Sequence, residues 1–467
     1  MFVNWSSFVD TKYRIYNSGQ GFILFNNVLY HITLGSYNSP NSIRHYDKES
    51  GQLEFVKITD KQYKSILKIQ DGFAIAITDN NKNGYEDILV TYVGKNSGIL
   101  AIYYLDTISK IWKSKTLRNP RNHPNASITV TPYGFLVGNT GDAPFLVRWN
   151  SSTKNYNIDT SFVNYDPSLK FKTRSIVNFK GLIEGVDGFV LNGINARLRE
   201  ADTFEQYCFT MNSNGIDIKP WLDNKKMNTM SVTFVNVNPA KGIYGFLFGN
   251  WAQESYLYMF KNGKYLKTHK FGVSYCTSVI AADFDNDGKD EIFFANGYLY
   301  NTLYKVHDED NIQQIEVGQA YTDAYYAPKG LFYMLSTIAM DIDQDGFLEL
   351  YTTAGYVFNT GNSWFKVGNI YRNGNRYLRV HPRNNNFSSH QGAIVKITYE
   401  GKTYKRIIDN GGNAMSQSEP VAHFGLGNYT GDIDVSIKWT DGTKTHIKGV
   451  KGNQVLNTFN KSVVKTR

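Results

Sequence analysis

Residues 283–291 read DFDNDGKDE, and residues 79–87 (DNNKNGYED) and 341–349 (DIDQDGFLE) repeat the same spacing. Each segment has Asp or Asn at positions one, three and five, Gly at position six and a carboxylate at position nine. Alternate residues of a tight loop project oxygen atoms to one side, and glycine permits the sharp reversal. Three copies of one nine-residue pattern predict that each loop wraps a Ca²⁺ ion.

The predicted ligands are side-chain oxygens at positions one, three, five and nine and the backbone carbonyl at position seven. In chain order they are Asp79, Asn81, Asn83, Tyr85, Asp87, Asp283, Asp285, Asp287, Lys289, Glu291, Asp341, Asp343, Asp345, Phe347 and Glu349. The first loop has fewer carboxylates, and calcium affinity falls with ligand charge. We therefore expect two or three structural Ca²⁺ ions.

The flanks of the loops argue against an EF-hand. Position twelve holds Val90, Phe294 and Thr352, where an EF-hand carries a bidentate Glu. Short apolar runs of β type, such as SVIAA before the second loop and IFFA after it, lie on both sides. The loops are therefore expected to join β-strands.

The spacing of the loops predicts the architecture. The second and third loops begin 58 residues apart, and the first and second begin 204 apart, which is close to four units of about fifty residues. Weaker copies of the strand–turn–strand outline occupy residues 127–147, 175–191 and 231–248. Units beginning near residues 15, 66, 124, 172, 228, 276 and 334 predict a seven-bladed β-propeller over residues 12–376. Six or eight blades remain open at this point.

The period stops near Asn375, and residues 377–459 read as a separate β unit, a small β-sandwich. Its expected strands are YLRVHP, AIVKITY, KTYKRIID, VSIKWT and THIKGV, separated by turns that contain glycine. The whole chain is thus predicted to be all-β, which agrees with its 15% aromatic residues and 40 glycines.

The loops with their flanking strands resemble the FG-GAP or VCBS-type repeats of integrin-α-like propellers. The C-terminal unit resembles the ASPIC and UnbV domain found after such propellers in the cartilage acidic protein family. The matching residues are Gly392, Ala393, Val395, Gly411, Gly412, Ser416, Gln417, Glu419, Pro420, His423 to Gly427 and Trp439 to Gly442. The resemblance implies adhesion or assembly at a cell surface or in an extracytoplasmic space.

Charge, cysteines and termini constrain the environment of the protein. The net charge is +9, and because the three loops carry −10, the rest of the chain carries +19. This balance favours an acidic partner such as a polyanionic glycan, or it is a solubilising excess of lysine. Cys208 and Cys276 are expected to be buried thiols. The sequence shows no signal peptide and no membrane-spanning segment, so an extracellular, cell-surface or periplasmic location stands beside an organelle interior.

The sequence shows no catalytic signature. GxSxG, HExxH and phosphate-binding loops are missing, and no nucleic-acid motif was found. His381, His390 and His423 cluster only because the C-terminal unit is short, and His423 is expected to be a packed or hydrogen-bonded residue. Asp290 with Glu291 makes a poor glycosidase pair because Glu291 is a predicted calcium ligand. Tyr321, Tyr325, Tyr326 and Trp251 are candidate surface platforms, although most such aromatics pack between sheets.

The leading hypothesis is therefore a non-enzymatic calcium-binding propeller that acts as an adhesion or scaffold module. It would bind a protein or an acidic glycan through loops on one propeller face. The alternatives are a structural or accessory subunit of a large assembly, or an enzyme with a pocket on the propeller axis.

Overall fold

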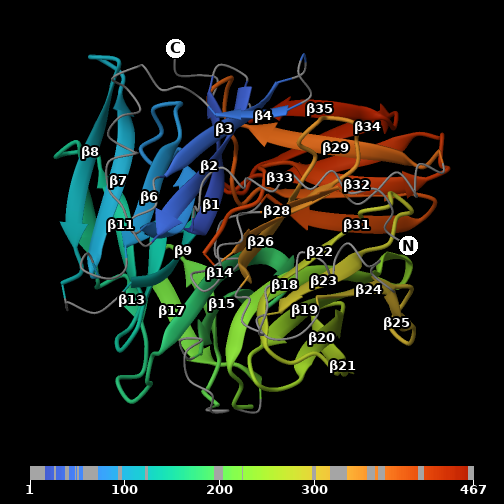
Figure 1. Cartoon of the computed structure of the whole chain (residues 1–467), viewed down its shortest axis with the longest axis horizontal. Helices are drawn as coiled ribbons and strands as arrows, with labels where there is room; N and C mark the ends of the chain where they lie inside the picture. Colours follow the sequence, from blue (N-terminus) through green and yellow to red (C-terminus); the bar gives the residue numbers. More distant parts are fainter. Residues whose placement is uncertain are drawn as a thin grey trace.

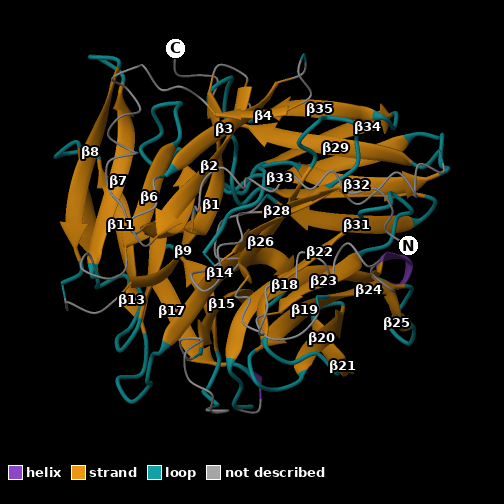
Figure 2. Ribbon diagram, in the orientation of Figure 1, coloured by secondary structure: helices purple, strands orange, loops and turns teal. Residues whose placement is uncertain are grey.

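The computed structural model describes residues 16–25, 28–36, 41–47, 49, 52–55, 72–92, 97–120, 125–193, 203–222, 225–296, 301–315, 334–354, 363–366, 374–408 and 415–460. Strands dominate these residues, as Figure 2 shows. A short 3₁₀ turn, η3 (Pro239–Lys241), interrupts the strands between β18 (Thr229–Asn238) and β19 (Ile243–Asn250). The all-β prediction is confirmed. Tyr321, Tyr325, Tyr326, Gly411, Gly412 and the chain ends lie outside the described residues.

Seven antiparallel sheets follow one another along residues 16–366 within the described part of the chain, and we call them the blade sheets. Apart from one added strand in the fourth sheet, each is a meander in which consecutive strands pair, and their order resembles propeller blades. The first three sheets contain β1 (Tyr16–Phe25), β2 (Val28–Ser36), β3 (Ser42–Asp47) and β4 (Gln52–Phe55); β5 (Gly72–Thr78), β6 (Asp87–Tyr92), β7 (Ile99–Asp106) and β8 (Ile111–Arg118); and β9 (Asn125–Thr131), β10 (Gly134–Asn139), β11 (Phe145–Asn150) and β12 (Asn155–Asp159).

The fourth blade sheet has a fifth strand, because β13 pairs in parallel with β17 at its outer edge. The described part of the seventh sheet has three strands. The last four sheets contain β13 (Val163–Asn164), β14 (Thr173–Ile183), β15 (Val186–Asn192), β16 (Tyr207–Asn212) and β17 (Gly215–Pro220); β18 (Thr229–Asn238), β19 (Ile243–Asn250), β20 (Ser255–Lys261) and β21 (Lys264–Phe271); β22 (Cys276–Ala282), β23 (Glu291–Asn296), β24 (Thr302–Val306) and β25 (Ile312–Ile315); and β26 (Met334–Met340), β27 (Glu349–Ala354) and β28 (Ser363–Lys366).

The first strands of the blade sheets lie side by side. Contacts run from β1 to β5, β9, β14, β18, β22 and β26 in order, and β26 also contacts β1. In Figure 1 the sheets follow one another in sequence colour, from blue through cyan on the left and green below to yellow at the lower right. Serine hydroxyls on these strands accept hydrogen bonds from the next sheet. The bonds are Ile176 N to Ser127 Oγ (2.6 Å), Val279 N to Ser231 Oγ (3.3 Å) and Thr337 N to Ser278 Oγ (3.2 Å).

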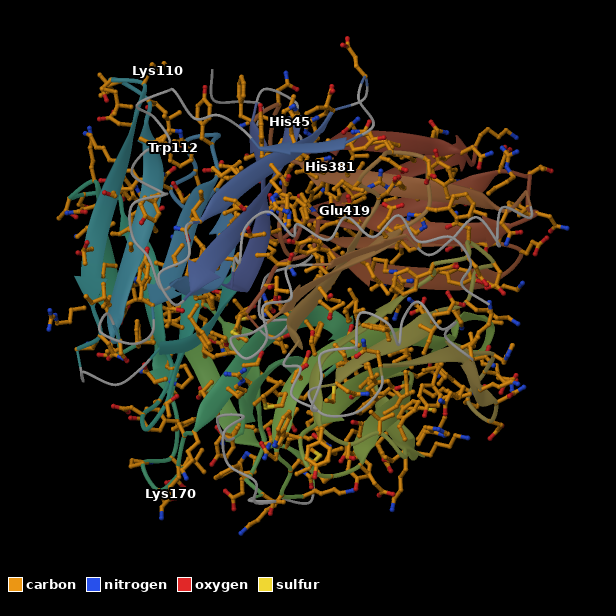
Figure 3. The ribbon with its side chains drawn as sticks, viewed as in Figure 1. His45, Lys110, Trp112, Lys170, His381 and Glu419 are labelled. Carbon is orange, nitrogen blue, oxygen red and sulfur yellow. The ribbon has the colours of Figure 1, made fainter. Side chains whose placement is uncertain are left out.

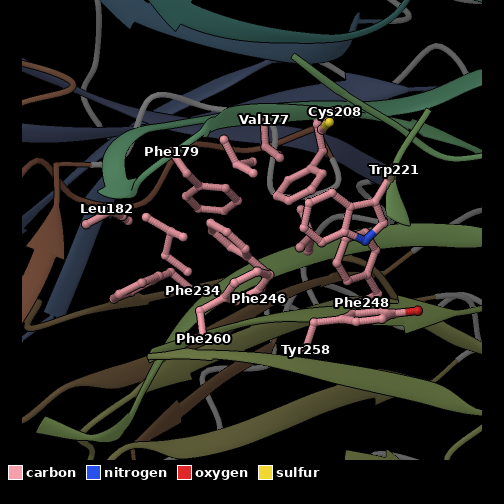
Figure 4. Close-up of a cluster of buried hydrophobic side chains, with 14 of the residues drawn as sticks. Val177, Phe179, Leu182, Cys208, Trp221, Phe234, Phe246, Phe248, Tyr258 and Phe260 are labelled. Atoms are coloured by element: carbon pink, nitrogen blue, oxygen red, sulfur yellow. The ribbon is translucent and has the colours of Figure 1, made fainter. Parts of the chain in front are cut away.

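Apolar side chains fill the space between neighbouring sheets. β19 is buried on both faces along its whole length, whereas the outer strand β8 is mostly exposed and buries only Trp112 and Leu117. Between the fourth and fifth sheets the core is largely aromatic, as Figure 4 shows. The Phe189 ring makes edge-to-face contacts with Trp221, Phe246 and Phe248 at 4.9–5.1 Å between centroids. The many Phe and Tyr residues are thus used mainly for packing between sheets.

The C-terminal unit consists of two sheets around a core of its own. All five predicted strands are present, but β32 and β35 were not predicted. β35 pairs in parallel with β29, which the sequence gives no reason to expect. The strands are β29 (Arg376–Arg383), β30 (Ile394–Tyr399), β31 (Lys402–Ile407), β32 (Ala422–Gly427), β33 (Ile433–Lys438), β34 (Lys444–Val450) and β35 (Gln454–Phe459).

Residues 415–417 of the C-terminal unit lie where the first and seventh blade sheets meet. The Ser416 hydroxyl accepts a hydrogen bond from Gln20 N of β1 (3.1 Å) and lies 2.7 Å from the Ser336 hydroxyl of β26. The Gln417 side chain bonds both backbone groups of Ile77 in β5, at 2.8 and 3.0 Å. This segment therefore joins the first two blade sheets to the last one.

Candidate metal centre

The three acidic loops connect the first and second strands of their sheets, between β5 and β6, β22 and β23, and β26 and β27. The strand flanks confirm that the loops are not EF-hands. All three use the same backbone hydrogen bonds. The amide of the position-six glycine donates to the Asp at position one, from Gly84 N to Asp79 (3.0 Å), Gly288 N to Asp283 (2.8 Å) and Gly346 N to Asp341 (3.0 Å).

The position-nine carboxylate of each loop accepts a hydrogen bond from the amide of position two. The distances are 3.0 Å for Asn80 N to Asp87, 2.9 Å for Phe284 N to Glu291 and 2.9 Å for Ile342 N to Glu349. The position-six glycines have φ values of +85° to +90°, a region that favours glycine. Because these bonds recur, the loops are three copies of one structural device, and each leaves further carboxylate oxygens for a cation.

The second loop gathers Asp283, Asp285 and Glu291, with one oxygen of each within 4.8 Å of the others. Oδ1 of Asp283 is buried and accepts no hydrogen bond. Burial, and then the nearby Glu291, raise the pKa of Asp283 well above its ordinary value. A divalent cation would relieve both effects, so the donor set fits a hard cation such as Ca²⁺.

The third loop repeats this arrangement with Asp341, Asp343 and Glu349. Oδ1 of Asp341 is buried without a hydrogen-bond partner, like its counterpart in the second loop. Burial raises the pKa of Asp341 to about 7, although Arg379 partly opposes the shift. The two loops that carry the most acids are therefore the two candidate metal centres, and Asp287 and Asp345 lie outside the gathered triads.

In the first loop, side-chain amides and a tyrosine hydroxyl provide hydrogen bonds in place of a metal. The Asn81 amide donates to Asp87 Oδ1 (2.8 Å), and the Asn83 amide donates to Leu105 O (2.9 Å). Tyr156 OH donates to Asp87 Oδ2 at 2.6 Å. Burial raises the pKa of Asp79 to about 7. The Asn81 amide thus occupies an Asp87 oxygen that a metal would bind, and the Asn83 amide is engaged with Leu105 O. Both observations agree with the weaker calcium site predicted for this loop.

The C-terminal unit covers the side of the blade sheets that carries the three loops, which we call the loop face. At the first loop, Glu86 accepts hydrogen bonds from Leu24 N (2.6 Å) and Ser389 N (3.0 Å). The Tyr85 ring stacks on Phe387 at 4.9 Å. Burial raises the pKa of Glu86 to about 7. Glu86 therefore joins the first sheet, the first loop and the C-terminal unit.

At the second loop the contacts come from β31 and β32. His423 Nε2 lies 2.7 Å from Asn286 Oδ1, and Gly427 N donates to Asn286 O at 2.7 Å. Arg406 makes a two-pronged ion pair with the buried Asp290, at 2.5 and 3.1 Å. His423 is hydrogen-bonded and buried, as predicted. Asp290 is engaged with arginine, which removes it from any glycosidase pair.

At the third loop an ion-pair triad joins the two parts of the chain. Arg379 of β29 contacts Asp341 Oδ2 at 2.9 Å and both oxygens of Glu419 at 2.7 Å. All three side chains are at most 5% exposed. Figure 3 labels Glu419 and His381 in the upper central part of the view. This triad holds residue 419 against the third loop.

The other two histidines of the C-terminal unit have separate partners. His381 Nε2 lies 2.9 Å from Ser389 Oγ, and His390 Nε2 lies 2.8 Å from Thr440 Oγ1. Burial lowers the pKa of His381 to about 3 and that of His390 to about 4. Both are buried side chains whose low pKa disfavours the charged form.

A cavity of about 150 Å³ lies between the inner strands and the C-terminal unit. Its wall includes Val177, Phe234 and Ile280 on the blade side and Arg406, Glu419 and His423 on the other. These three polar side chains are already bound to Asp290, Arg379 and Asn286 respectively. The cavity is therefore mainly a gap at a docked interface.

One surface prediction requires correction. Trp251 is 1% exposed and packs against Tyr275, because it follows a fully buried strand, so it forms no surface platform. The C-terminal unit covers the acidic loops. Cys208 and Cys276 are buried free thiols, as predicted.

Sequence reasoning missed several residues that organise this centre: Glu86, Lys305, Arg379 and Arg406. A signal was present for part of the interface, because the SQSEP and HFGLG segments contain Ser416, Gln417, Glu419 and His423. Those residues contact the blade sheets. The motif thus contains residues that dock on the blade sheets. The sequence alone does not show which residues of the blade sheets they contact.

The fold and the loops define a propeller-like repeat protein with a C-terminal ASPIC and UnbV domain, because residues 382–463 match the ASPIC and UnbV family. The chain is distantly homologous to cartilage acidic protein 1. The Mus musculus protein is 31% identical over 216 residues, which cover 42% of this chain and 31% of the relative. The Homo sapiens protein is 32% identical over 212 residues, with the same coverage. The chain thus spans less than a third of these relatives.

Solved structures give a looser likeness. The BP39L lectin from Burkholderia pseudomallei has a TM-score of 0.43 and 8% identity, over 75% of this chain and 98% of the lectin. Saccharomyces cerevisiae Sqt1 has a TM-score of 0.42 and 12% identity, over 78% of this chain and 98% of Sqt1. Within the described residues, no helix has the length and apolar character needed to cross a bilayer.

Proposed function

We propose that the protein is a non-enzymatic, calcium-stabilised scaffold: a closed seven-bladed β-propeller with its C-terminal unit locked onto the loop face. The observation that carries this proposal is the pair of buried acid triads, each with an Asp oxygen that accepts no hydrogen bond. A buried carboxylate oxygen without a hydrogen-bond partner is costly, so a divalent ion bound to these two Asp oxygens would stabilise the fold. The ions would be structural, because every surrounding acid serves a loop or an ion pair.

The closed ring is supported by the contacts of the inner strands. Seven successive sheets meet in chain order, and β26 returns to β1. Many propellers mix strands from both chain ends in one blade, but here each described sheet is contiguous in sequence. Residues 415–417 would supply closure instead, because Ser416 bonds to both Gln20 and Ser336.

The partner would be a protein or an acidic glycan. Because the C-terminal unit covers the loop face, the partner would bind elsewhere, on outer strands or on the opposite face. Strand β21 carries exposed Lys264 and Lys270 beside Tyr265, which is 52% exposed. Such a basic and aromatic edge suits an acidic partner. Homology to cartilage acidic protein 1 supports an extracellular or cell-surface location.

A second candidate is a structural or accessory subunit of a large assembly, which the basic surface and rigid interface would also suit. An enzyme with an axial pocket is less well supported, because the polar groups of the axial cavity are committed to ion pairs and hydrogen bonds.

The proposed function is tested by thermal melting of the whole chain in calcium and in chelator. Calcium at about 100 times its Kd is expected to stabilise the wild type by roughly 2.7 kcal/mol for each site. Asp343→Ala is expected to lose the gain from the third loop, and Asp432→Ala, an exposed acid in a surface ion pair with Lys451, is expected to keep it. Identical melting of the wild type in both conditions would contradict the proposal.

A further inference from the structure

The second loop already contains a positive charge at the position of a bound cation. Lys305 Nζ lies 2.6 Å from Asp285 Oδ2, 2.8 Å from Asp287 Oδ2 and 2.9 Å from Glu291 Oε1. The backbone amides of the loop use the other oxygen of each of these carboxylates. Lys305 therefore contacts carboxylate oxygens of two members of the triad, Asp285 and Glu291, and of the neighbouring Asp287, while Asp283 Oδ1 stays without a hydrogen bond.

The position of Lys305 is fixed by strand pairing. Lys305 of β24 lies directly opposite Glu291 of β23 in the antiparallel register. In the seventh sheet, Lys366 of β28 occupies the same register position opposite Glu349 of β27. The two loops rich in acids therefore share a lysine on the neighbouring strand, opposite the position-nine glutamate.

The first loop differs in its number of acids and in the residue that lies opposite position nine. It has fewer acids, and the register that pairs Ile88 with Tyr103 places Tyr104 opposite Asp87. Its Asn81 amide donates to Asp87 Oδ1, which corresponds to the oxygen that Lys305 contacts in the second loop. Lysine thus accompanies the acidic version of the loop, and an amide replaces it where the charge is lower.

We infer that Lys305 is a built-in counter-cation that competes with the divalent ion for the second loop. This inference rests on the proposed metal binding. Ca²⁺ binds oxygen at 2.3–2.6 Å, so an ion on these three oxygens overlaps with an ammonium group at 2.6–2.9 Å from them. Calcium binding therefore requires Lys305 to leave.

Two opposite consequences follow from this competition. Without calcium, the ammonium group keeps the acidic loop folded by offsetting the repulsion between its carboxylates. With calcium, the same group weakens binding, because the ion must first displace it. The lysine thus reduces the dependence of the fold on calcium and sets the affinity of the loop.

The test is calcium binding by isothermal titration calorimetry, with chemical denaturation in chelator, on the whole chain carrying Asp343→Ala so that the second loop dominates. Lys305→Gln is expected to bind calcium at least about tenfold more tightly than its parent and to unfold at lower denaturant in chelator. Lys305→Arg keeps the charge and should resemble the parent. Lys267→Gln, which removes an exposed lysine paired with Asp310, is the surface control.

The outcomes separate this inference from the proposed function. If the parent binds calcium and Lys305→Gln binds it with the same affinity, the inference about Lys305 is overturned and the proposed calcium site stands. Binding by Lys305→Gln without binding by the parent supports the inference and shows that lysine has replaced calcium at this loop. If neither the parent nor Lys305→Gln binds calcium, both the proposed competition and the proposed calcium site in the second loop are wrong. If Lys305→Gln fails to fold in chelator, recovery of folding by calcium supports the inference, and no recovery opposes it.

Discussion

Arg379→Ala is expected to lower the free energy of unfolding by about 3–5 kcal/mol, the cost of removing one partner from a buried ion pair. The substitution leaves Asp341 and Glu419 buried and facing each other without the guanidinium that binds both. Glu419 also accepts a hydrogen bond from Asp341 N, so its displacement disturbs the third loop. The shift of the urea denaturation midpoint in chelator measures this loss.

Two further variants control the Arg379 experiment. Arg148→Ala removes an arginine that is 45% exposed and paired with Asp159 at the surface, and it is expected to cost no more than about 1 kcal/mol. Arg379→Met combined with Glu419→Leu removes both charges and should recover part of the loss. A loss below about 1 kcal/mol for Arg379→Ala would show that the triad does not hold the two parts together.

Gly425→Ala is expected to prevent normal docking of β32 on the second loop. A Cβ atom built on Gly425 would lie 2.1 Å from Asp283 Oδ2 and 2.4 Å from Asn286 Cα. The loop backbone is fixed by its own hydrogen bonds, so the strand must move away and lose the bonds of His423 and Gly427 to Asn286. We expect a loss of about 3 kcal/mol, at the upper end for an overpacked site, and a lower melting temperature reports it.

Gly272→Ala is the matched control, because a Cβ atom there meets nothing within 4 Å and the residue has no positive φ. Its melting temperature should stay close to that of the wild type. If Gly425→Ala melts at the wild-type temperature, β32 does not pack tightly against the second loop. The proposal that the C-terminal unit is locked onto the loop face would then be wrong.

The blade sheets were predictable because each one repeats a local pattern. The expected units near residues 124, 172, 228, 276 and 334 begin within one residue of β9, β14, β18, β22 and β26. Apolar strands of short period and glycine turns carry this signal even where the acids are missing. The strand flanks of the acidic loops were predictable for the same reason.

The interface was not predictable, because its partners are distant in sequence. Glu86 bonds to Ser389, and Gln20 bonds to Ser416, across about three hundred residues or more. Lys305 was missed because only the strand register places it opposite Glu291. β32 was missed because AHFGLG contains two glycines, which weaken a strand signal. Contacts between segments that are distant in the sequence decide all three features. The residue pattern of a single sequence does not show which distant segments pair.

The most direct test of the central claim is amide hydrogen exchange of the whole chain, measured by mass spectrometry in calcium and in chelator. If ions stabilise the acidic loops and the unit docked on them, calcium should slow exchange in peptides covering the second and third loops and strand β32. Peptides from the outer strand β8 should exchange equally in both conditions. Equal exchange in the loops with and without calcium would contradict the account.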